Sequence, residues 1–122
     1  MINKMKLLQL NVSREPFEVM VTGEKQIEFR KFSKWIYSRI YDEVNNCFRK
    51  DYDGVKITHG YGKNRPYFIA YLYDIENICH CVCCNEINTT HKYSNELKVR
   101  EMDYDYRILL GEIIETGNIR KK

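Results

Sequence analysis

The sequence predicts an α+β domain in which a small mixed β-barrel, or a closed sheet, carries two short N-terminal helices. The chain has 122 residues, a length that suits one domain rather than two. Segments with the strand period of two recur along the chain, whereas helical spacing occurs twice and only near the start. We therefore expect a single domain over residues 1–122, with a variable excursion over 78–103 and a short basic tail over 117–122.

The predicted strands over 55–59 and 67–75 are rich in β-branched and aromatic residues, and the first two strands have apolar side chains at every second position. Leu8, Leu10 and Val12 show this pattern in the opening strand, where they share one face. In the second strand Ile27 and Phe29 alternate with two charged residues, so we expect the apolar pair to face the core and the charged pair to face away. The full set of predicted strands covers residues 6–12, 26–30, 55–59, 67–75 and 106–114.

The two predicted helices are bounded by residues that favour helix ends. Ser13 is suited to the N-cap of the first helix, and Gly23 ends it because glycine readily adopts the left-handed conformation common at that position. Ser33 is the predicted N-cap of the second helix. The polar residues 42–53 are predicted to form a surface loop, and the glycine-rich residues 60–66 a connection without regular structure.

Positive charge is concentrated in one part of the chain. The formal net charge is only +3, but residues 25–65 hold ten Lys or Arg and five Asp or Glu, so this stretch carries +5 and the rest −2. Such an asymmetry predicts a positive face that attracts phosphates. The alternative is a solvated surface with scattered lysines.

The compartment is predicted from what the sequence lacks. Residues 1–10 contain no apolar stretch of the secretory type, and no apolar run approaches the roughly 18 residues of a membrane helix. Four of the five cysteines crowd into residues 79–84, unlike the spacing of a secreted disulfide scaffold. We expect a cytoplasmic protein that does not bind membranes.

The stretch from Gly23 to Arg30 carries the strongest functional signal. Strand alternation places Glu28 and Arg30 on the same side, and Lys25 lies at the turn that enters the strand. An ammonium, a carboxylate and a guanidinium that converge beside a helix end suit a polar or anionic small group. The simpler alternative is a surface ion pair between Glu28 and Arg30, worth under about 1 kcal/mol.

These residues also carry a family resemblance. Gly-x-Lys-x-x-Glu-x-Arg directly after a short helix resembles the signature of the ASCH domain, a relative of the PUA domain, and Trp35 soon after the signature is similar to that family too. Residues 59–66 are similar to the small phage-encoded members, and residues 110–114 to their closing strand. The resemblance covers most of the chain except residues 78–103.

The resemblance implies a PUA-like barrel with a cleft that binds RNA or modified nucleosides. Some ASCH members hydrolyse N4-acetylcytidine with a lysine, a threonine and a glutamate, and nuclease activity is also known in the family. Lys25 matches that lysine by position, but Glu28 stands where the family has threonine, and a carboxylate cannot replace a hydroxyl without changing the chemistry. An amidohydrolase or ribonuclease would use Lys25 as general base and Glu28 to orient Lys25 or the substrate.

A binding role requires less of the residues. Cationic side chains would meet phosphate, tyrosines such as Tyr67 would stack on an unpaired base, and an amide would bond to a base edge. Packing in the barrel wall is the alternative for the tyrosines, and turn chemistry the alternative for the asparagine. The ligand-binding candidates, besides Lys25, are Arg30, Trp35, Tyr61, Lys63 and Asn64.

Metal binding is a minor alternative. Cys81 and Cys84 form a C-x-x-C pair to which Cys79 or His91 would add ligands, but the second pair of a zinc site is missing, so buried thiols are favoured and no cofactor is expected. His59 is either a base in the cleft or a strand histidine satisfied by its neighbours.

The sequence thus favours a module that binds RNA or a modified nucleoside. The first alternative is a small hydrolase acting through Lys25 and Glu28. The second is a phage-type interaction module whose partner is a host protein.

Overall fold

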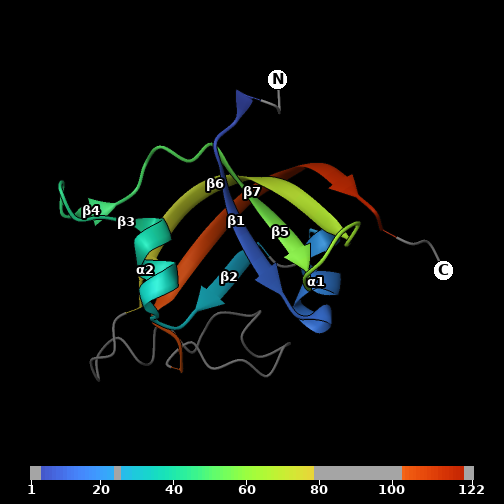
Figure 1. Cartoon of the computed structure of the whole chain (residues 1–122), viewed down its shortest axis with the longest axis horizontal. Helices are drawn as coiled ribbons and strands as arrows, with labels where there is room; N and C mark the ends of the chain where they lie inside the picture. Colours follow the sequence, from blue (N-terminus) through green and yellow to red (C-terminus); the bar gives the residue numbers. More distant parts are fainter. Residues whose placement is uncertain (1–3, 24–25, 79–102, 120–122) are drawn as a thin grey trace.

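The computed structural model describes residues 4–23, 26–78 and 103–119 of the chain. Within these ranges it is an α+β structure, which confirms the predicted class (Figure 1). The helices are α1 (Arg14–Val21) and α2 (Lys34–Ile40). The strands are β1 (Leu7–Val12), β2 (Ile27–Arg30), β3 (Tyr41–Asp42), β4 (Cys47–Phe48), β5 (Gly54–His59), β6 (Tyr67–Asn77) and β7 (Tyr106–Gly117).

Five of these strands form one mixed sheet that curls strongly into a half-barrel (Figure 1). The strand order is β1-β5-β6-β7-β2, with β1 parallel to β5 and the other neighbours antiparallel. The long pair β6 and β7 shifts register three times between Ile69 and Asp74. Such irregularities bend a strand and increase its twist, so they account for the curl at the middle of the sheet.

The main core consists of apolar side chains from both helices and the inner face of the curled sheet. The predicted alternation is confirmed in β1, where Leu8 and Leu10 are buried and Gln9 between them is exposed. Burial of one such side chain contributes about 1.5–3 kcal/mol relative to exposure. The largest fully buried members are Leu8, Leu10, Met20, Ile36, Ile40, Val55, Ile57, Phe68 and Ile108.

The helix ends confirm most of the predicted signals. Gly23 follows α1 with a φ of +84°, and its N–H donates to the carbonyl of Met20. The hydroxyl of Ser33 accepts from the N–H of Ile36 and caps α2. Ser13 stands at the N-cap of α1, but its side chain makes no capping hydrogen bond, and only its carbonyl accepts from Phe17.

The predicted surface loop over residues 42–53 contains a short hairpin that was not expected from the sequence. Strands β3 and β4, which have two residues each, pair there as a hairpin, and its turn contains Asn46 at a φ of +52°. The carboxylate of Asp42 accepts from the backbone N–H of Val44 and from the side chain of Asn45. Phe48 packs against the main core and the ring of Tyr41, but strands of two residues are too short to show apolar alternation in the sequence.

The predicted excursion and basic tail are described only at their ends. Ile78 is buried and Gly117 closes β7, whereas residues 79–102 and 120–122 lie outside the described residues. None of the helices in the described part of the chain is long and apolar enough to cross a membrane.

Candidate functional site

Strand β2 presents its charged residues to the inside of the half-barrel, so the predicted orientation of this strand is wrong. Glu28 pairs with Ile108 of β7, which belongs to the main core, and directly paired residues share one face of a sheet. Ile27 and Phe29 face the other side, where they form a second cluster with Ile78. Because both faces of β2 are covered, alternation alone does not tell which face is the inner one.

The result is a buried ion pair. Glu28 is 6% exposed, and its Oε2 accepts from Nε of Arg30 at 3.0 Å and lies 2.8 Å from Nη2. The same Nη2 donates to the backbone carbonyl of Asn11 at 2.5 Å. This pair differs from the surface ion pair considered from the sequence, because neither side chain is freely hydrated and the guanidinium also bonds to a second strand.

Arg30 therefore bridges the two edges of the curled sheet. Strand β1 and strand β2 are the first and last in the strand order and are not backbone partners. The bond from Arg30 to Asn11 nevertheless brings these edges together at one end of the half-barrel. The curl of the sheet and this side-chain bridge together place Glu28 beside the start of α1.

A cavity of about 410 Å³ opens at this junction, and we call it the Glu28 pocket. Its volume falls within the roughly 300–1,000 Å³ of small-molecule sites. Two carboxylates and two cations line it, so their formal charges cancel. The lining comprises Asn11, Val12, Ser13, Glu15, Pro16, Glu28, Phe29, Arg30, Lys31 and Tyr104.

Of the four signature residues, two meet in the Glu28 pocket. Glu28 and Arg30 line it, whereas Gly23 lines a separate cavity together with Gln26. Lys25 lies outside the described residues. The structure therefore confirms the contact between the carboxylate and the guanidinium, and the convergence of all three charged groups stays a prediction.

Tyr61 and Asn64 lie in a second cavity, of about 360 Å³, which we call the Lys56 groove. Its lining comes from β1, β5 and β6, from the connection between β5 and β6, and from Asn118 after β7. Asn11 lines both the pocket and the groove. The lining comprises Gln9, Asn11, Lys56, Thr58, Gly60, Tyr61, Gly62, Asn64, Arg65, Tyr67 and Asn118.

The remaining candidates lie apart from these two cavities. Trp35 on α2 is 47% exposed and packs under the guanidinium of Arg39, 5.4 Å from the ring centroid, and lines neither cavity. Lys63 is exposed on the connection above the groove without lining it. The ring of His59 stacks on Phe17 at 5.7 Å, which fits a strand histidine satisfied by packing.

Several lining residues were not singled out from the sequence. Ser13 is predicted only as a helix cap, Lys31 is one of the ten cations of residues 25–65, and Asn11 and Tyr104 carry no functional signal. The one available signal was the outward position of Asn11 in β1, opposite to Leu10. Lys56 was counted among the cations, but nothing in its local sequence distinguished it.

The weak metal proposal is not tested by the structure. Cys79, Cys81, Cys84 and His91 all lie outside the described residues. Within the described ranges, no three His, Cys, Asp or Glu side chains lie close enough together to hold a metal ion.

Comparisons of the chain with protein-family models, with curated proteins and with solved structures give no match.

Proposed function

We propose that this chain is a PUA-like module of the ASCH type that binds RNA or a modified nucleoside, with one base in the Glu28 pocket. The observation that carries the proposal is the buried carboxylate of Glu28, fixed by Arg30 and facing a cavity of about 410 Å³.

The chemistry of the pocket favours a base with an N–H group. A carboxylate accepts hydrogen bonds, as from the exocyclic amino group of cytosine. Its two contacts with Arg30 fix it before the ligand arrives, which lowers the entropic cost of binding. Tyr104 and Phe29, whose ring centroids lie 5.7 Å apart, line the same cavity and add aromatic surface for a base.

Binding is preferred to hydrolysis for a chemical reason. The described groups of the pocket supply hydrogen-bond acceptors, donors and aromatic surface. The hydrolase alternative needs a hydroxyl where this chain has Glu28, and a carboxylate cannot replace a hydroxyl without changing the chemistry. No specific observation favours a host protein as the partner.

A calorimetric screen of nucleosides tests the proposal. Cytidine and N4-acetylcytidine, which carry an exocyclic N–H, are expected to bind more tightly than uridine. The Glu28→Gln variant keeps the shape of the side chain but loses the charged acceptor, and we expect affinity to fall about tenfold or more.

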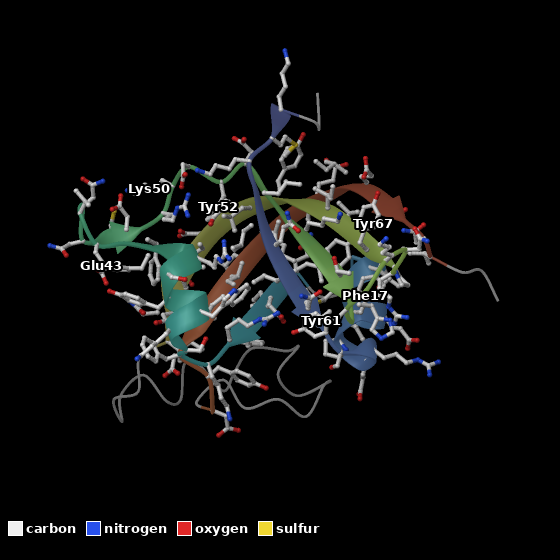
Figure 2. The ribbon with its side chains drawn as sticks, viewed as in Figure 1. Phe17, Glu43, Lys50, Tyr52, Tyr61 and Tyr67 are labelled. Carbon is white, nitrogen blue, oxygen red and sulfur yellow. The ribbon has the colours of Figure 1, made fainter. Side chains whose placement is uncertain are left out.

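Glu43→Gln is the matched control, because it removes the same charge from an exposed residue in the β3–β4 turn, at the far end of the molecule from Tyr61 (Figure 2). Both variants should show the circular dichroism spectrum of the unaltered protein. The proposal is overturned if no nucleoside binds, or if Glu28→Gln binds as tightly as Glu43→Gln. Turnover of N4-acetylcytidine that is lost in Lys25→Ala would restore the hydrolase.

A further inference from the structure

The Lys56 groove differs in charge from the rest of the sheet surface. Among its lining residues in the described part of the chain there is no carboxylate. Amide side chains come from β1, from the β5–β6 connection and from the end of β7, and hydroxyl groups from Thr58, Tyr61 and Tyr67. Lys56 and Arg65 give the groove two formal positive charges. Such a lining offers donors and cations without a competing acid.

The ammonium group of Lys56 is held in place by an aromatic ring. Its Nζ lies 4.4 Å from the ring centroid of Tyr67, which is within the range of a cation–π contact. The hydroxyl of Tyr67 donates to Oε2 of Glu115 at 2.7 Å, which fixes the ring that Lys56 contacts. Gly117 makes room for the ring, because a Cβ there would lie 2.2 Å from a ring carbon.

Arg65 is fixed from the other side of the groove. Its Nε donates to the carbonyl of His59 at 2.9 Å, and its own carbonyl accepts from the side chain of Asn118 at 3.4 Å. Within residues 4–23, 26–78 and 103–119, neither Arg65 nor Lys56 takes part in an ion pair. Both charges are therefore available to an anion from outside.

Two further features indicate what the anion belongs to. Tyr61 at the rim is 84% exposed, and an exposed aromatic ring beside fixed cations is typical of surfaces that bind single-stranded nucleic acid (Figure 2). Asn11 lines the groove and also the Glu28 pocket, so the two cavities are neighbours. A ligand that enters the pocket with one base extends naturally over the groove with the next phosphate.

We propose that the Lys56 groove binds the backbone phosphate next to the base in the Glu28 pocket, with the following base on Tyr61. The ligand of the pocket is then a single-stranded nucleic acid rather than a free nucleoside. This inference rests on the proposed function of the pocket and adds a second, phosphate-binding site to it.

The test compares a short single-stranded RNA with the best nucleoside of the screen. Affinity for a labelled pentanucleotide is measured by fluorescence anisotropy at about 50 and 200 mM salt, and affinity for the nucleoside by calorimetry. Lys56→Gln and Arg65→Gln are each expected to weaken RNA binding several-fold and to reduce the salt slope by about 0.7. Tyr61→Ala is expected to weaken it at least about fivefold with the slope unchanged.

Nucleoside affinity is expected to stay unchanged in all three variants. Lys50→Gln is the matched control, because Lys50 is an exposed lysine beside β4 that does not line the groove (Figure 2). If Arg65→Gln does not fold, Lys56→Gln carries the test alone, since its side chain makes a ring contact rather than a backbone bond.

The possible failures are distinguishable. Unchanged RNA affinity and salt slope in Lys56→Gln overturn the groove, while loss of nucleoside binding in Glu28→Gln still supports the pocket. RNA binding that depends on Lys56 but not on Glu28, with no nucleoside bound, overturns the pocket and supports the groove. Equal, Lys56-dependent binding of duplex RNA or of an acidic peptide overturns the assignment to a single strand.

Discussion

The Glu28 pocket and the Lys56 groove share Asn11, yet they handle positive charge in opposite ways. In the pocket, Arg30 binds the buried carboxylate of Glu28 and a backbone carbonyl. In the groove, Lys56 and Arg65 have no carboxylate partner among the described residues. We therefore expect a phosphate at these cations of the groove rather than at Arg30, although all three lie in the same cation-rich stretch of sequence.

Arg30 has a structural role in addition to the one expected from the sequence. Its bonds to Glu28 and to the carbonyl of Asn11 shape the pocket, and its role as a phosphate ligand stays a prediction. We therefore expect the two cavities to respond differently to loss of an arginine, to changes in packing and to acid.

The largest expected effect is on the free energy of unfolding when Arg30 is replaced, and the same replacement of Arg65 is the comparison. Arg30→Ala removes the cation that bonds to the buried carboxylate of Glu28 at 2.8 Å and breaks the bridge between β1 and β2, so we expect the free energy of unfolding to fall by about 3 kcal/mol. Arg65→Ala loses one hydrogen bond to a loop carbonyl and should cost about 1 kcal/mol. Urea denaturation measures the free energy of unfolding of both variants. Equal losses would contradict the view that Arg30 has a structural role and that Arg65 is available to a ligand.

A smaller effect is expected at Gly117, which tests the groove without touching its cations. The added methyl group of Gly117→Ala collides with the ring of Tyr67, so we expect a loss of about 1–3 kcal/mol and weaker RNA binding through displacement of Lys56. Nucleoside binding in the pocket should not change. Tyr67→Phe keeps the ring and serves as the control. If it loses as much RNA affinity as Gly117→Ala does, the effect belongs to the hydroxyl of Tyr67 and not to the position of its ring.

The smallest effect is expected for an exposed ion pair, which completes the contrast with Glu28. Hydrogen bonds from Arg49 and then Lys6 hold the pKa of Asp51 well below its ordinary value of 3.8. Because the folded-state pKa is the lower one, this stabilisation is fully present above about pH 4 and is lost as the pH falls further.

Asp51→Asn should therefore lower Tm slightly at about pH 7, and the gap to the unaltered protein should shrink on acidification toward about pH 3. Thermal melts at a series of pH values measure this. A gap that widens toward acid would reverse the sign of the linkage.

The features predicted from the sequence are those with local causes. Apolar alternation located β1, and enrichment in β-branched and aromatic residues located β5 and β6, each to within a few residues, because such side chains suit a partly buried pleated surface. Gly23 and Ser33 marked helix ends because their bonds reach residues only three positions away. The hairpin of β3 and β4 escaped prediction because its strands have only two residues each, too few to show a period of two, and its turn is held by the side chains of Asp42 and Asn45.

By itself, the sequence determined the α+β class, most element positions and the pairing of Glu28 with Arg30. Only the tertiary structure decided which face of β2 is inside and how the candidate residues divide between a pocket and a groove. Both depend on the curl of the sheet, which brings β1 and β2 together from opposite ends of the strand order. The pattern of apolar residues along a strand predicts that a face is buried, but it does not predict which other element buries it. The residues that surround Asn11 therefore follow from the curl of the sheet and not from the sequence pattern.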